Sequence, residues 1–359
     1  MERGYKINSI KKINPIIKII IIIVITIVII VIVLYFLLYF KKSLPVGTSD
    51  MPVEEIFDSN QTEILQNDEQ YFSTLEENSF SGGPGKDGIP SIDAPEYTSI
   101  AEGDNWLQPD DIVFGINYKG LIAAYPQRIL VWHEIVNETI EDEYIVISYC
   151  PLTGTSIGYN GYLDANTQSR FGVSGKLVNS NLIMYDRVTD SYWPQIIGTA
   201  INGEAKGYRL IEFPIIWTTW EKWKNSYPSS KVLSRETGFI RNYDIGGDPY
   251  GSYLMDSGGY YFSDQIIFPL VNTDDRLSPK TVVIGIRDME RNAVAVLKDS
   301  LRENKNMEID LAGKTIILIY DEELDFYSAK IKESGEWINA FDAMWFSWAG
   351  YYPETELIK

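Results

Sequence analysis

The stretch "YIVISYCPLTGTSIGYN", residues 144–160, has the pattern of a β-strand, a sharp break at Pro151 and a second strand. The same pattern returns in "TIILIYDEELDFYSAKI", residues 315–331. Tyr149 and Tyr320 occupy the same place in the two stretches and lie 171 positions apart. A repeat of this kind indicates that one structural unit occurs twice in the chain.

Two further pairs of segments extend the repeat. Residues 112–130, "IVFGINYKGLIAAYPQRIL", are echoed by residues 282–301, "VVIGIRDMERNAVAVLKDSL", and residues 220–233, "WEKWKNSYPSSKVL", by residues 345–358, "WFSWAGYYPETELI". The last pair is only 125 positions apart, so the first copy holds about 46 additional residues (171 − 125). We therefore predict two related β-rich lobes, residues 86–278 and 279–359, with an insert in the first at about 161–216.

The fold class that this pattern predicts is mainly β, an α+β fold with few short helices. Residues 111–126 read as a hairpin, and further strands are expected at Glu143–Tyr149, Thr155–Leu163, Asn181–Arg187, Lys231–Ser234 and Gln265–Val271. One helix is expected to begin at Pro126 and to continue through Ile135. A second is expected in "TTWEKWKNSYP", residues 218–228.

The N-terminus predicts a membrane anchor. Residues 19–40, "IIIIIVITIVIIVIVLYFLLYF", carry no charge and are long enough to cross a bilayer as a helix. Five basic residues precede this run against the single acid Glu2, which favours a cytoplasmic N-terminus. We expect residues 1–42 to hold a cytoplasmic segment and an uncleaved signal anchor, with its helix at about 16–40. The protein is then a single-pass protein of the cell membrane, with its folded part outside the cytoplasm.

The charge of the chain limits its partners. The formal net charge is −19, and such an acidic surface repels nucleic acid. Residues 43–85 contain many acids and no Lys or Arg before Lys86, so we predict an acidic flexible stalk there. Asn60 and Asn137 begin glycosylation sequons, a weak signal compatible with exposure outside the cell.

Cys150 and His133 are the only thiol and the only imidazole in the chain. Both lie in the first copy of the repeat: Cys150 aligns with Asp321 and His133 with a position near Glu303. Because residues needed only for packing would more often recur in both copies, we predict that the two side chains face one pocket and act together. Other candidates for this pocket are Asp87, Tyr149, Asn181 and Gln195.

Three hypotheses describe what this pocket does. The first is binding of a small ligand or a soft metal, copper or zinc, by His133, Cys150, Met184 and Asp186, with Asp87 as a further carboxylate. The second is a cysteine nucleophile activated by His133, with an oxyanion stabilised by Arg128, Arg170 or Arg187; sortase-type transpeptidases use the same parts. The third is a non-catalytic surface binding or structural module, which the 13% aromatic content would suit for contact with peptide or glycan.

Several long motifs carry a family resemblance. They include "GGPGKDGIPSIDAP", "AYPQRILVWHEIVN", "SYCPLTGTSIGYN", "FGVSGKLVNSNLIMYDRVTDSYWPQIIG", "VLSRETGF" and "MWFSWAGYYPETEL". Together, over residues 82–357, they resemble the uncharacterised family known as domain of unknown function 3179. The resemblance implies no activity, because none is established for the family. Relatives commonly read Cys-Pro-Leu-Cys where this chain has Thr153 in the last place, which argues against a dithiol or two-sulfur metal site here.

Overall fold

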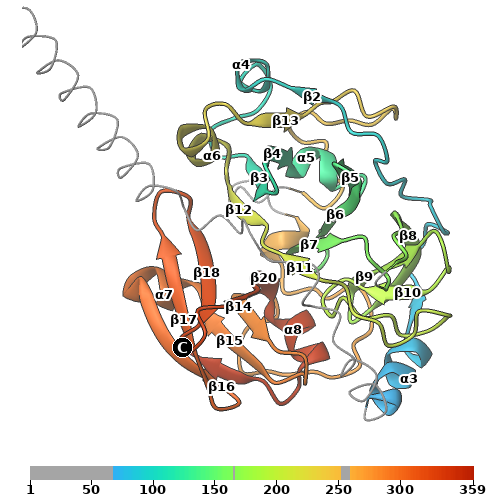
Figure 1. The fold of residues 1–359 in the computed structure, drawn as a ribbon, viewed down its shortest axis with the longest axis vertical. Helices are drawn as coiled ribbons and strands as arrows, with labels where there is room; N and C mark the ends of the chain where they lie inside the picture. Colours follow the sequence, from blue (N-terminus) through green and yellow to red (C-terminus); the bar gives the residue numbers. More distant parts are fainter. Residues whose placement is uncertain (1–67, 165, 252–258) are drawn as a thin grey trace, which may run out of the picture. The chain divides into compact units, whose positions relative to one another are not determined.

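Five β-sheets make up the part of the chain that the computed structural model describes, residues 68–164, 166–251 and 259–359. Figure 1 shows these sheets arranged as blades around a ring. The mainly β fold class and the two related lobes predicted from the sequence are confirmed.

Each lobe supplies two of the five sheets. In the first lobe, one sheet has the order β12 (Ile216–Thr219), β3 (Ile112–Tyr118), β4 (Leu121–Pro126), β13 (Lys231–Leu233) and β2 (Tyr97–Thr98). The other has the order β11 (Glu212–Phe213), β7 (Thr155–Asn160), β6 (Glu143–Cys150) and β5 (Ile135–Ile140). In the second lobe, one sheet has the order β20 (Ala340–Met344), β14 (Val282–Arg287), β15 (Ala293–Leu297) and β21 (Glu356–Ile358). The other has the order β16 (Asn306–Leu311), β17 (Lys314–Asp321), β18 (Phe326–Ile331) and β19 (Trp337–Ile338).

The fifth sheet belongs mostly to the insert. Its order is β1 (Phe80–Ser81), β8 (Phe171–Val178), β9 (Asn181–Asp186) and β10 (Tyr192–Pro194). Short helices connect the sheets: α3 (Glu69–Glu77), α4 (Ile100–Gly103), α5 (Gln127–Leu130), α6 (Trp220–Ser226), α7 (Lys298–Asn304), α8 (Trp345–Tyr351) and a 3₁₀ turn at Tyr260–Phe262.

The repeat is visible in the strand pairing. In both lobes a hairpin, β3–β4 or β14–β15, takes an antiparallel neighbour on one side, β12 or β20. A helix, α6 or α8, follows this neighbour and leads to a parallel strand on the other side, β13 or β21. The two segments therefore fold in the same way although they share few identical residues.

A glycine under a tryptophan ring occurs at the same place in each lobe. A Cβ atom on Gly115 would lie 2.0 Å from the Trp223 ring, and one on Gly285 would lie 2.2 Å from the Trp348 ring. The indole N–H of Trp223 donates to the Ser230 hydroxyl at 3.0 Å. Trp348 donates in the same way to a threonine hydroxyl of its own lobe at 3.1 Å. Each helix is thus held to its sheet by a ring that rests on bare backbone.

Some local predictions were wrong. The helix that begins after Pro126 ends at Leu130, and Ile135 already belongs to β5, because Glu134 has a left-handed backbone (φ 58°) that ends the turn. The strand expected at Gln265–Val271 does not form, since this stretch has no partner strand in the described chain. The sequon at Asn137 is buried, and its amide binds Asp93 and Phe171.

The predicted stalk is folded where the structure describes it, from residue 68 onward. The helix α3 buries Phe72 and Leu75 in the core, and β1 pairs with β8. Acidic residues on α3 are compensated from the insert, as in the Lys206–Glu69 ion pair at 2.6 Å. The many charged residues of this segment suggested a flexible stalk, although its two buried apolar residues pack α3 on the core.

The predicted anchor, residues 1–42 with its helix at about 16–40, lies outside the described residues. Among the residues that the structure describes, no helix has the length and apolar content needed to cross a bilayer.

We predict that Gly115→Ala lowers the free energy of unfolding by about 1–3 kcal/mol, because the new methyl group would overlap the Trp223 ring and force it to move. Chemical denaturation of the full-length protein measures this. Gly85→Ala is the matched control, since a Cβ there meets no atom within 4 Å. Equal stability of Gly115→Ala and Gly85→Ala would contradict the role assigned to the glycine.

Candidate functional site

His133 is a buried histidine with both ring nitrogens engaged. Nδ1 lies 2.7 Å from the carbonyl oxygen of Pro90, so it carries the proton and donates, while Nε2 accepts from the Tyr243 hydroxyl at 2.6 Å. Burial lowers the pKa of His133 to about 4, so the ring is neutral at pH 7. These contacts tie the turn after α5 to two loops.

Cys150 ends β6 inside the core. Its sulfur lies 3.3 Å from the amide nitrogen of Leu182, which donates to it, and 3.8 Å from the Ser180 carbonyl oxygen, which accepts from the thiol. Burial, followed by the nearby Glu134 carboxyl, raises the pKa of the thiol to about 11. A cysteine nucleophile needs a shift in the opposite direction. Within the described chain no hydrogen bond joins Cys150 to His133, and each has other partners.

The four residues proposed as metal ligands do not converge. Met184 is buried in the same core cluster as Cys150, but Asp186 is occupied elsewhere. The Asp186 carboxylate accepts hydrogen bonds from the turn that follows β9 and, at 3.0 Å, from the Trp193 indole N–H. In the part of the chain that the structure describes, no group of three or more His, Cys, Asp or Glu side chains is arranged to hold a metal ion.

The arginine candidates lie in separate places. Arg128 forms a nearly buried ion pair with Asp111 at 2.7 Å. Arg170 lies over the Tyr144 ring, and its buried Nε has no hydrogen-bond partner in the described chain. Arg187 and Asp87 do come together: two guanidinium nitrogens each lie 3.2 Å from a carboxylate oxygen of Asp87.

The Arg187–Asp87 pair is part of a half-exposed cluster that joins the "GGPGKDGIPSID" segment to β9. The Tyr185 hydroxyl donates to Asp87 at 2.5 Å, and Arg187 also reaches Ser91 and Asp93. Neither Cys150 nor His133 contributes to this cluster.

Asn181 and Gln195 belong to a buried network beside Cys150. The Asn181 amide donates to Gln195 Oε1 at 2.9 Å and to the Thr153 hydroxyl at 3.1 Å. Gln195 in turn donates to the Ser148 hydroxyl at 3.0 Å. This network closes the interface between the insert and β6–β7, with Thr153 as one of its members. Its members are buried side chains that hydrogen-bond to one another.

Sequence reasoning missed Glu134, the residue next to His133. Its side chain is 5% exposed, and its carboxyl group forms no hydrogen bond within the described residues. Burial raises its pKa to about 8, so Glu134 is protonated at pH 7 beside Cys150 and Tyr250. The repeat offered a signal: the equivalent residue, Lys305, has the same left-handed backbone (φ 62°) but is exposed.

A second polar group that the sequence did not reveal lies near Tyr149. Gln127 donates to the Asp248 carboxylate at 2.8 Å and lies 3.4 Å from the Tyr149 hydroxyl. Burial raises the pKa of Asp248, and Tyr261 also donates to it. Asp248 lies in a loop with no periodic pattern, so nothing local indicated that it would reach Gln127.

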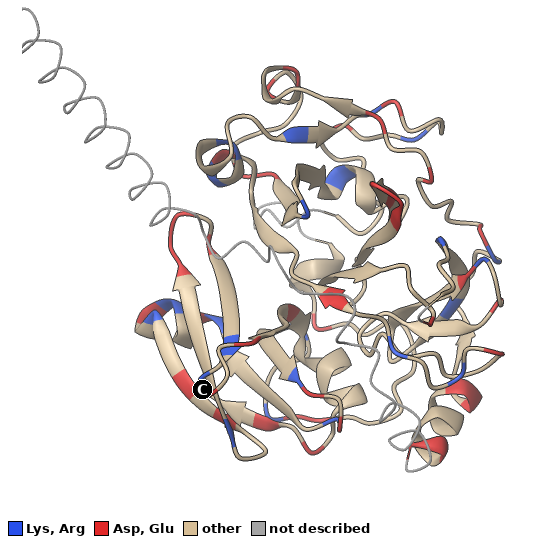
Figure 2. Ribbon diagram, viewed as in Figure 1, with Lys and Arg blue, Asp and Glu red and all other residues tan. Residues whose placement is uncertain are grey.

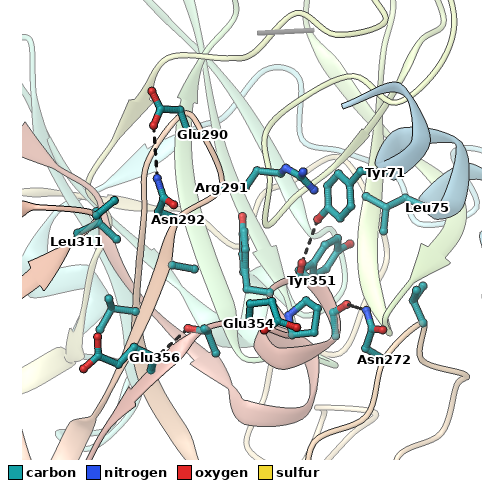
Figure 3. Close-up of a pocket in the computed structure, with 18 of the residues that line it drawn as sticks. Tyr71, Leu75, Asn272, Glu290, Arg291, Asn292, Leu311, Tyr351, Glu354 and Glu356 are labelled. Atoms are coloured by element: carbon teal, nitrogen blue, oxygen red, sulfur yellow. Dashed lines mark hydrogen bonds between the residues drawn. The ribbon is translucent and has the colours of Figure 1, made fainter. Parts of the chain in front are cut away.

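The cavities we describe lie away from Cys150 and His133. The largest, of about 660 Å³, is formed by α3, the β14–β15 turn and the end of α8, and we call it the α3 cavity. Figure 3 shows Tyr71 against Tyr351 on one side of it and Glu290, Glu354 and Glu356 around it. Its lining contains exposed side chains, so it opens to solvent.

The family model described as protein of unknown function (DUF3179) matches residues 86–336. The chain belongs to this family. No curated protein and no solved structure matches it. The matched range ends before the motif "MWFSWAGYYPETEL" at residues 344–357. The family description names no activity, so the chemistry has to be argued from the residues themselves.

We predict that Glu134→Gln changes how stability depends on pH. The folded-state pKa of Glu134, about 8, lies above its ordinary value of 4.5, so the folded chain retains a proton that the unfolded chain has lost. This contribution is fully present below pH 4.5 and is lost as pH rises to 8. Relative to the wild type, Glu134→Gln should therefore gain about 3–5 kcal/mol of unfolding free energy between pH 4.5 and 8.

Urea denaturation across this pH range measures the effect. Glu141→Gln is the matched control, since Glu141 is exposed and lies in the next turn. A difference between Glu134→Gln and wild type that stays constant with pH would show that Glu134 is ionised in the folded protein.

Proposed function

We propose that this protein is a non-catalytic binding module, held outside the cytoplasm by an N-terminal anchor, and that its ligand occupies the α3 cavity. The observation that carries the proposal is the charge of this cavity. The thiol and the imidazole, which suggested a metal or a nucleophile, are buried and engaged in contacts that hold the fold together. We therefore place the ligand in the α3 cavity, whose lining includes exposed side chains.

Acidic side chains without an ion-pair partner in the described chain line the α3 cavity. Four acidic residues line it and form no ion pair within the described chain: Glu290, Asp310, Glu354 and Glu356. The basic residue in the lining is Arg291, which is already paired with Asp68 at 2.8 Å and lies over the Tyr71 ring at 4.1 Å. Elsewhere acidic and basic residues are interspersed over the molecule (Figure 2).

This charge selects a cationic ligand. The exposed carboxylates that line the cavity attract cations over a distance. A cavity of about 660 Å³ has room for more than a single side chain. Among ligands of this charge we favour a basic peptide segment.

We predict that a fluorescent Lys/Arg-rich peptide binds the full-length protein and that the Glu354→Gln/Glu356→Gln variant binds it about fivefold to thirtyfold more weakly, because two attractive charges are lost. Fluorescence anisotropy at low and moderate salt measures this. The affinity of the wild type should fall as salt rises, and the variant should show a weaker salt dependence.

Glu303→Gln/Glu323→Gln is the matched control, since it removes two exposed acids that are not in the cavity. If this control weakens binding as much as the cavity variant does, the peptide responds only to net charge and the proposed site is wrong. A wild type that binds an uncharged peptide of the same length equally well would also refute it.

We infer the position of the protein from residues 1–42, whose apolar run favours an anchor with the N-terminus inside. Protease added to intact cells should then release a fragment that begins between residues 43 and 67, because α3, which follows, is packed on the core. Immunoblotting with an antibody against the C-terminal lobe detects the fragment. Complete protection in intact cells, with digestion only after lysis, would reverse the orientation.

A further inference from the structure

A second cavity lies between the two lobes. It has a volume of about 400 Å³, and we call it the interlobe cavity. Gly154 and Trp217 of the first lobe line one side of it. Its other lining residues belong to the second lobe and are Thr281, Val282, Leu297, Lys298, Asp299, Arg302, Asp342 and Met344. It is therefore formed by the packing of the two copies and is absent from either copy alone.

A nearly buried ion pair faces this cavity. Lys298 Nζ lies 2.5 Å from an Asp342 carboxylate oxygen, and the two side chains are only 13% and 10% exposed. Such a pair usually contributes little to stability, because removing both charges from water costs about as much as their attraction returns. Its presence needs another explanation.

The first lobe shows that the fold does not require this pair. Leu297 pairs with Val283 as Pro126 pairs with Val113, so the residue equivalent to Lys298 is Gln127. By the same comparison of β20 with β12, Asp342 is equivalent to Trp217. The same architecture is built there without an ion pair at these positions.

The acidic and basic residues that line the cavity are equal in number. Lys298 and Arg302 are offset by Asp299 and Asp342, so the lining favours no net ligand charge.

Trp217 contributes an aromatic surface of fixed orientation. Its ring meets the Phe114 ring edge-on, with centroids 4.9 Å apart and an interplanar angle of 87°. Neighbouring β12 residues 216 and 218 are buried, whereas Trp217 is half-buried and lines the cavity. A rigid indole beside paired donors and acceptors suits a ligand that is apolar on one face and rich in hydroxyl groups at its edge.

We propose that the interlobe cavity binds a sugar ring of an uncharged saccharide. The C–H face of the ring packs on Trp217, and ring hydroxyls donate to the Asp342 carboxylate and accept from Lys298. In this arrangement Lys298 and Asp342 each form a hydrogen bond with the ligand while the ion pair between them stays intact. The site is independent of the α3 cavity, with which it shares no lining residue.

Isothermal titration calorimetry of the full-length protein tests the proposal. The probes are neutral tetrasaccharides of three kinds: a β-1,4-glucan, an α-1,4-glucan and a β-1,4-linked N-acetylglucosamine oligomer. We expect at least one to bind, and we expect Asp342→Asn and Trp217→Leu each to weaken it by about tenfold or more, since each removes one of the two faces that hold the sugar.

Two matched variants serve as controls. Trp337→Leu removes a half-buried tryptophan of another cavity, and Asp275→Asn removes an exposed aspartate; neither should change the affinity. Thermal melts identify any variant that fails to fold, and Lys298→Met then replaces it in the comparison. Absence of binding to all three tetrasaccharides, or binding that Asp342→Asn leaves unchanged, would overturn the proposal.

Discussion

The contact on which the rest of the structure depends is that between a glycine of a β-hairpin and the tryptophan of the helix packed on it. Gly115 and Gly285 leave the backbone bare, and the rings of Trp223 and Trp348 occupy the space that a side chain would fill. A hydroxyl of the same lobe satisfies each indole N–H, so a large apolar ring is buried without an unpaired donor. Because the contact occurs in both lobes, each helix packs on its sheet through the same kind of contact.

The insert is joined to the second lobe by a buried charge pair. Arg287, on β14, forms two hydrogen bonds with the Glu212 carboxylate at 2.7 and 3.1 Å and two with the Ile196 carbonyl oxygen. Asn339 adds a further hydrogen bond to Glu212 at 2.8 Å. Because the charges of Arg287 and Glu212 are paired in this way, their burial is tolerated, and the contact joins the insert to the second lobe.

The two rarest residue types in the chain did not indicate the site, because both side chains are buried. Cys150 and His133 were singled out because each is unique in the chain, but uniqueness does not show whether water reaches a side chain. In the folded protein desolvation raises the pKa of the thiol and lowers the pKa of the imidazole, so both are neutral at pH 7. Glu134, a common residue type, has the more unusual environment, because its carboxyl group is buried without a hydrogen-bond partner among the described residues.

The sequence by itself determined the mainly β fold and the duplication, because periodic apolar residues and repeated Gly, Trp and Pro positions are local patterns that persist when sequences diverge. Only the tertiary structure decided which polar residues meet. Asp87 and Arg187 lie 100 positions apart, Gln127 and Asp248 lie 121 apart, and Trp217 and Asp342 come from different lobes. Such pairs depend on how the sheets pack around the ring, and no period or spacing in the chain encodes that packing.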